Sequence, residues 1–454
     1  MHLIDEQNRK WWLLGAISCV LGIVLLDETV VGVALPTIQK SFGLSNTEAH
    51  WVVNAYLLTF AAFVAIGGRL ADLFGTLRVF LTGLTIFSVC SLVCGFAPTG
   101  SILIAARAAQ GLGAAIIFPL YVAMIGMTFP KEQRGFGLAV GGAVGTSFLA
   151  LGPLTGGLLT EFVSWRWIFW INPLIAVGVG TIVALTWREI DRPAGQRMDW
   201  IGLLLIAVGM FCVVFALMEA NNWGWEDLRI PGFLVAGVAL LVLFCRVEVS
   251  RRTPLIEVQL FRDMVFTSSN LTILMAQYSK IILFVFIALY AQTELGLGPL
   301  QAGALVMLSP ILQPPAALVC GRMTKKMSYK GLVLIGITGL GVCLIWLTVV
   351  APLKNLLLVA CILPLSGAVF PFVMIPTRAA ILAMLPEHKH GQGGGVSMAS
   401  QISGGTIGLA ISSAVFPFGG YQAVFGVAAA LFHVAGVPHR SARKRLIRSS
   451  ETPF

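Results

Sequence analysis

Four ionisable residues stand inside long apolar stretches of the chain. They are Asp27 and Glu28, Arg107, and Lys280, and Arg378 lies within or at the edge of a further span. A charge near the centre of a bilayer costs about 3 kcal/mol or more, so each needs a partner or a task. Burial favours the neutral form of a carboxylate, whereas a nearby guanidinium favours its ionised form. Asp27 or Glu28, acting with Arg107, is therefore predicted to exchange protons; the alternative is a structural ion pair that only holds two helices together.

The expected helix ends place these groups at one depth. If the first span ends near Val33, Asp27 and Glu28 lie about 9 Å from that end. If the fourth span begins near Ser101, Arg107 lies about 9 Å from its start. Successive residues of a helix point ~100° apart, so the two carboxylates cannot both face one point.

Lys280 interrupts an apolar stretch between residues 264–279 and 281–293. A lysine near the middle of a span does not easily reach either interface with its ammonium group. It either binds an anionic group of a substrate, which would indicate a cargo with a carboxylate, or neutralises a carboxylate across the cavity. A satisfied structural charge is the remaining alternative.

Uncharged polar residues also occur within the apolar stretches. We expect them to line a substrate cavity; the alternative is that each makes a hydrogen bond between helices, which is the commoner role of such residues. They are Asn54, Tyr56, Gln110, Gln277, Tyr278 and Gln313.

The elements that position these residues are predicted to be membrane-spanning helices. Apolar residues make up 57% of the chain and come in charge-free blocks. Blocks of ~20 residues match the ~30 Å hydrocarbon core of a bilayer. Breaks at charges and at the turns near Pro98 and Pro417 divide the chain into about fourteen spans. The expected fold class is an all-α integral membrane protein.

Basic residues indicate how the chain is threaded through the membrane. Most of the 30 Lys and Arg residues fall in alternate connections, which follows the positive-inside rule if both termini are cytoplasmic. The net charge of +10 is thereby explained without nucleic acid. The basic tail is expected to lie on anionic lipid headgroups.

Two short echoes predict an internal repeat. The segment Pro130–Gly135 resembles Pro386–Gly391, and Gly68–Leu70 resembles Gly321–Met323, at similar separations. These echoes predict two parallel six-helix bundles with two inserted central helices, an alternating-access architecture. The expected parts are 1–190 for the first bundle, 191–260 for the inserted helices and linkers, 261–438 for the second bundle, and 439–454 for a basic cytoplasmic tail.

Several motifs resemble the major facilitator superfamily, in particular its fourteen-span drug:proton antiporter branch. Leu26–Pro36 is similar to the signature of the first span, Arg107–Ala114 to that of the fourth, and Trp165–Asn172 is also typical. The resemblance implies that Asp27 is the cavity-facing or structural carboxylate. It also implies two further sets of residues: a gating motif of Gly68, Arg69, Asp72, Gly75 and Arg78, and an antiporter helix with Gly141, Gly145, Gly152, Pro153, Gly156 and Gly157.

The resemblance implies a secondary-active exporter of small amphipathic compounds, driven by proton antiport. The expected partners are a small-molecule substrate, protons and the lipid bilayer, with no nucleic acid, no metal and no cofactor beyond the proton gradient. A monomer in a bacterial inner membrane is expected. A dedicated metabolite or siderophore exporter is an alternative within the same fold.

A membrane-embedded enzyme or receptor is the alternative from another class. An enzyme is not expected, because no loop carries a nucleophile and base or a metal cluster. A receptor is not expected either, because the sequence shows no signalling domain. The chain has no Gly-Lys dipeptide and hence no Walker A loop, which argues against direct coupling to ATP.

Overall fold

The computed structural model describes residues 8–64, 66–188, 199–251, 257–324, 326–385 and 390–436, and within them the regular structure is helical, without strands. The predicted tail 439–454 lies outside the described residues. The α-helices are α1 (Arg9–Phe42), α2 (Asn46–Phe63), α3 (Ile66–Phe74), α4 (Thr76–Phe96), α5 (Gly100–Thr128), α6 (Lys131–Phe162), α7 (Trp167–Thr186), α8 (Trp200–Trp223), α9 (Arg229–Ser250), α10 (Met264–Thr293), α11 (Pro299–Met307), α12 (Gln313–Met323), α13 (Tyr329–Val350), α14 (Leu356–Met384) and α15 (His390–Gly436). Short 3₁₀ helices are η1 (Val258–Arg262), η2 (Pro310–Leu312) and η3 (Ala351–Leu353).

The described residues contain 12 helices that are long and apolar enough to cross a membrane, or up to 13 if the pair α2 and α3, bent by 55°, is one span. The fourteenth predicted span would be the end of α15. There the backbone is not helical at Gly419 and Gly420, next to the break expected at Pro417. Residues 421–436 follow this break and are helical up to the end of the described residues, so the count of fourteen stays a prediction.

Helix α1 is longer than expected. The prediction that it ends near Val33 was wrong, because it continues through Pro36 to Phe42 and ends at Gly43 with φ 64°. Ala34, Leu35 and Ile38 are fully buried, so packing holds the helix together beyond the proline. Asp27 consequently lies about 22 Å from the end of α1, near its middle, rather than about 9 Å from it.

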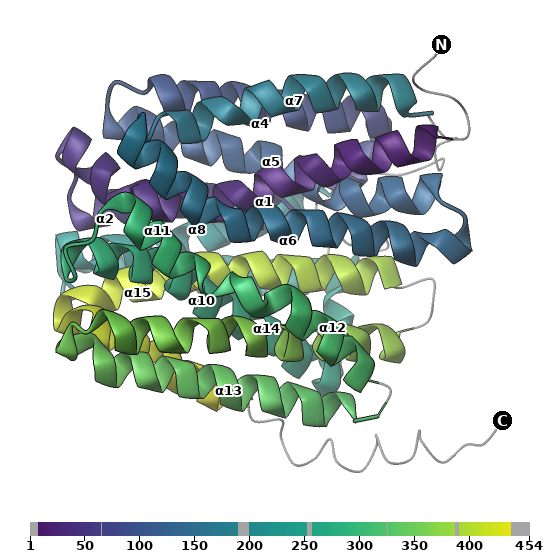
Figure 1. The fold of residues 1–454 in the computed structure, drawn as a ribbon. Coiled ribbons are helices and arrows are strands. Elements are labelled where there is room, and N and C mark those ends of the chain that lie inside the picture. The colour runs from purple at the N-terminus through teal and green to yellow at the C-terminus, as the bar shows by residue number, and fades with distance from the viewer. Residues whose placement is uncertain are drawn as a thin grey trace.

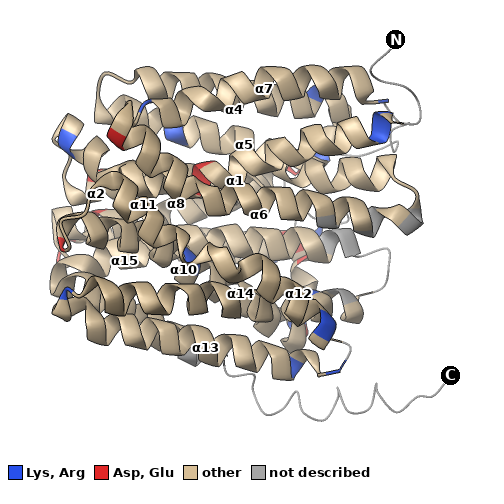
Figure 2. Ribbon diagram, in the orientation of Figure 1, with Lys and Arg blue, Asp and Glu red and all other residues tan. Residues whose placement is uncertain are grey.

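The helices form two bundles, α1–α7 and α10–α15, which lie one above the other in Figure 1. The same pairings occur in both: α1 packs on α6 as α10 packs on α15, and α4 packs on α5 as α13 packs on α14. Charged residues gather at the two ends of the helices, with few in the middle (Figure 2). The predicted residue boundaries of the domains stay a prediction.

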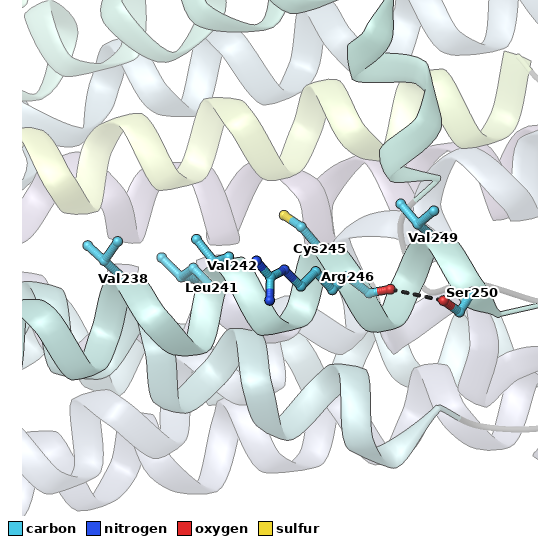
Figure 3. A pocket seen from close by; sticks show the side chains of 7 residues that line it. All are labelled: Val238, Leu241, Val242, Cys245, Arg246, Val249 and Ser250. Atoms are coloured by element: carbon cyan, nitrogen blue, oxygen red, sulfur yellow. Dashed lines mark hydrogen bonds between the residues drawn. The ribbon is translucent and has the colours of Figure 1, made fainter.

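Helices α8 and α9, which separate the bundles in sequence, pack on each other, and α8 also packs on α2 and α15. The Trp51 indole donates to Glu219 of α8 at 2.8 Å, and Asn221 of α8 donates to the Ser413 carbonyl at 2.8 Å. Helix α8 is therefore bonded to both bundles. Helix α9 carries an apolar groove on its outer side, lined only by its own residues, including Cys245 and Arg246 (Figure 3).

The two bundles meet mainly at one end of the molecule. We call the end with Asn8 and Gly75 the Asn8 end, and the opposite end, with Gly43 and Gly296, the Gly43 end. Near the Gly43 end, α6 packs on α11 and α2 packs on α15, whereas α3 and α12 pack on helices of their own bundles. The helices are thus closed against each other at the Gly43 end.

Candidate functional site

Asp27 lies in a polar network within the first bundle. Its carboxylate is fully buried and forms an ion pair with Arg107 of α5. Gln110 donates to Asp27 Oδ1 at 3.0 Å, and Asn172 of α7 donates to the same oxygen at 3.3 Å. The predicted partners Asp27 and Arg107 are therefore brought together, and they join α1, α5 and α7.

Arg107 is enclosed on all sides. Its Nε donates to the Val52 carbonyl at 3.0 Å, and its guanidinium carbon lies 4.3 Å from the centre of the Tyr56 ring. Its side chain is about 1% exposed. Removing one partner from such a pair leaves an uncompensated buried charge, so we expect the two residues to be needed together.

Glu28 points away from this network and faces the other bundle. Glu28 Oε1 lies 3.5 Å from Nζ of Lys280, near the middle of α10. Gln277, one turn earlier on α10, donates to the same oxygen at 2.5 Å. Both charged side chains are about 7% exposed. The adjacent carboxylates of α1 thus differ in role: Asp27 binds within its own bundle, and Glu28 binds across the interface.

The contact with Glu28 extends through residues that the sequence analysis did not single out as site residues. Gln401 of α15 donates to Gln277 Oε1 at 3.2 Å, and the Arg378 guanidinium of α14 donates to Gln401 Oε1. Asn172 was noted only as part of a motif, although it binds Asp27. A polar residue in an apolar stretch was the available signal for Gln401 and Asn172.

The remaining predicted cavity residues are separated in the structure. Gln110 and Tyr56 belong to the buried surroundings of Asp27. Tyr278 is buried against α15, where its hydroxyl accepts from Ser412 at 3.4 Å. Gln313 begins α12 and is half-buried.

Asn54 is buried and unsatisfied. It is fully buried, and neither polar atom of its side chain has a hydrogen-bond partner. It lies one turn after His50, whose Nδ1 is 2.7 Å from the Ser413 hydroxyl of α15. Residues four apart share a helix face, so Asn54 points toward the interface between the bundles. An unsatisfied buried amide costs about 1–3 kcal/mol, which is tolerable if it gains a partner in another state.

The glycines of the predicted antiporter helix allow α6 to approach other helices closely. A Cβ on Gly145 would lie 3.0 Å from Leu21 of α1, and Gly152 and Gly156 also face α1. Gly141 faces Tyr121 of α5. At the Gly43 end, Gly157 and Pro153 face α11. The row therefore packs α6 against its own bundle and against the other one.

The gating motif lies at the Asn8 end. Gly68, Arg69 and Asp72 are on α3, Gly75 forms the turn with φ 96°, and Arg78 is in the first turn of α4. In this conformation α3 packs on α5 and α4. The expected contact of the motif with the second bundle stays a prediction for the opposite conformation.

A substitution at Gly157 should open the Gly43 end. In Gly157→Val the added Cβ would lie 2.6 Å from the Pro299 carbonyl oxygen and 2.8 Å from the Leu300 Cα, and backbone cannot yield without separating the helices. We expect labelling of Ser413→Cys by an impermeant maleimide, in a background without other cysteines, to rise several-fold. Gly142→Val on the same helix is the control, since nothing lies within 4 Å of its Cβ. Equal labelling of both variants would contradict the expected role.

Comparisons with known proteins agree on one family. The family model of the Major Facilitator Superfamily matches residues 17–247 and 270–451. A puromycin resistance protein of Streptomyces alboniger is 33% identical over 416 residues, which cover 90% of this chain and 82% of that protein. A tetracenomycin C resistance and export protein of Streptomyces glaucescens is 29% identical over 426 residues, covering 89% and 76%. The crystal structure of a peptide transporter has a similar fold, with a TM-score of 0.73 at 16% identity, covering 98% of this chain and 99% of that one.

Two apolar helical bundles that meet around buried charges, together with these matches, define a multi-pass membrane transporter. The chain belongs to the major facilitator superfamily. The two Streptomyces relatives are antibiotic resistance and export proteins, which confirms the predicted resemblance to the drug-exporting branch.

Proposed function

We propose that the protein exports small amphipathic compounds in exchange for protons, by alternating access between the two bundles. The observation that carries the proposal is the Glu28–Lys280 contact, a buried pair of opposite charges that joins α1 to α10 near the middle of both helices. Relatives that confer resistance to puromycin or export tetracenomycin C support compounds of this kind as cargo.

The proposed proton step takes place at Glu28. An ionised Glu28 attracts Lys280 and accepts from Gln277, which holds the bundles together at mid-membrane. A proton on Glu28 removes the attraction and frees Lys280, so the relative position of the bundles can change. Asp27 keeps its partners within the first bundle during this step.

The proposed orientation places the Asn8 end in the cytoplasm, as the distribution of basic residues favours. The conformation closed at the Gly43 end then faces the cytoplasm and receives cargo. The protein is proposed to act as a monomer in a bacterial inner membrane, with the proton gradient in place of a cofactor and without enzymatic activity.

Proton-driven transport can be measured in proteoliposomes with an acidic lumen. We expect at least one amphipathic compound from a panel of anionic, neutral and cationic probes to accumulate inside, since protons leave the lumen as cargo enters. A protonophore should abolish the accumulation, and liposomes without protein serve as the control. Failure of every tested compound to move under the gradient, or movement insensitive to the protonophore, would refute the proposal.

A further inference from the structure

The charged residues within the apolar helices do not cancel. Asp27 is paired with Arg107, and Glu28 is paired with Lys280. Arg378 is a third cation within an apolar helix, and it makes no ion pair with any residue in the described ranges. Together these helices therefore carry one positive charge more than Asp27 and Glu28 neutralise, and that charge is Arg378.

Arg378 reaches toward the centre rather than toward the end of its helix. Its Cα lies about 9 Å from the end of α14, whereas its hydrogen-bond partner Gln401 lies about 16 Å from the start of α15. Both of those helix termini lie at the Asn8 end. A long cationic side chain in a membrane helix ordinarily extends to the nearest interface, so the inward direction needs a reason.

The hydrogen bonds from Arg378 run in one direction. Its guanidinium donates to Gln401, the Gln401 amide donates to Gln277, and the Gln277 amide donates to Glu28. Every donor points toward Glu28, the buried end, while the Arg378 side chain at the other end is exposed. Arg378 is thus held in place by one bond, and its remaining N–H groups are left for another acceptor.

This arrangement treats anionic and cationic cargo differently. To bind Asp27 or Glu28, a cationic cargo must displace Arg107 or Lys280, and breaking a buried ion pair is costly. An anion can bind Arg378 without breaking any ion pair, and a guanidinium binds carboxylate, sulfonate or phosphate with two parallel hydrogen bonds. The cost of binding is therefore lower for an acidic compound.

We infer that the cargo is an amphipathic compound with an acidic group, which binds Arg378 beside Gln401, between α14 and α15. The inference rests on the proposed export function and defines its substrate class. Lys280 becomes a second cation for the acidic group when Glu28 is protonated. An anionic lipid headgroup shares this chemistry, so the experiment must separate the two sources.

Binding of three matched probes tests the substrate class. Pyrenebutyric acid, its primary amide and pyrenebutylamine share one ring and chain but are anionic, neutral and cationic. We would measure their fluorescence anisotropy with the full chain in nanodiscs of phosphatidylcholine alone. The acid should bind at least tenfold more tightly than the amide, the effect expected of one charge-assisted hydrogen bond. Arg378→Gln should remove this preference, whereas Arg246→Gln on the outer face of α9 should keep it.

Three outcomes would overturn the inference. The first is that the acid does not bind, or binds no more tightly than the amide. The second is that the amine binds most tightly of the three. The third is that phosphatidylglycerol displaces the acid, which would make Arg378 a binding site for anionic lipid. A transport assay of the same probes separates this inference from the export function. If the amide or the amine moves under the gradient and the acid is not preferred, only the inferred substrate class is contradicted. If the acid binds most tightly but no probe moves under the gradient, the export function is contradicted and the anion site is still supported.

Discussion

Replacement of Arg107 by alanine is expected to abolish export and to destabilise the first bundle by about 3–5 kcal/mol, the usual cost of breaking a buried ion pair. The variant leaves the Asp27 carboxylate buried with only Gln110 and Asn172 as donors. It also removes the bond to the Val52 carbonyl, which ties α5 to α2. Thermal unfolding of the detergent-solubilised protein, followed by intrinsic fluorescence, measures the loss of stability.

Two further variants separate stability from coupling. Asp27→Asn combined with Arg107→Gln removes both charges and should regain most of the lost stability, since no buried charge is then left uncompensated. Arg229→Ala is the control, because its ion pair with Asp227 is exposed and should affect neither unfolding nor transport. If Arg107→Ala unfolded at the wild-type temperature, the structural role of the pair would be refuted.

The pairing of Asp27 with Arg107 could be predicted from the sequence because its energetics leave few alternatives. A charge in an apolar helix must be neutralised, and the chain offers few opposite charges away from the helix ends. The same reasoning allowed Lys280 to neutralise a carboxylate across the cavity. It did not say which one, since the choice between Asp27 and Glu28 depends on the rotation of α1 against α10.

Other features depend on packing that no local pattern encodes. The continuation of α1 beyond Val33 follows from burial of Ala34, Leu35 and Ile38, although Pro36 is a local signal to stop. The path from Arg378 to Glu28 joins four different helices, so its members lie far apart in sequence. Tyr56 and Gln110 were expected in a cavity because a polar residue looks the same in sequence whether it faces water or a buried ion pair.

Glu28→Gln is expected to uncouple transport from the proton gradient without unfolding the protein. The glutamine keeps the size of the side chain and can still accept from Gln277, but it cannot take up or release a proton. Gradient-driven accumulation of a probe that the wild-type protein transports should fall at least tenfold in acid-loaded proteoliposomes. Exchange of labelled for unlabelled cargo across the membrane should continue, because it requires binding and reorientation but no net proton movement.

Asp27→Asn should have a different effect from Glu28→Gln. Asp27 is fully buried and bound within its own bundle, so its loss should act first on stability. Glu28 and Lys280 are slightly exposed and join the two bundles, so loss of Glu28 should act first on coupling. Lys280→Gln in the Glu28→Gln background should add little to the coupling defect, as expected for two residues that act as one unit. Gradient-driven accumulation by Glu28→Gln at the wild-type level would show that the proton is carried elsewhere, with Asp27 the remaining carboxylate near the middle of the described helices.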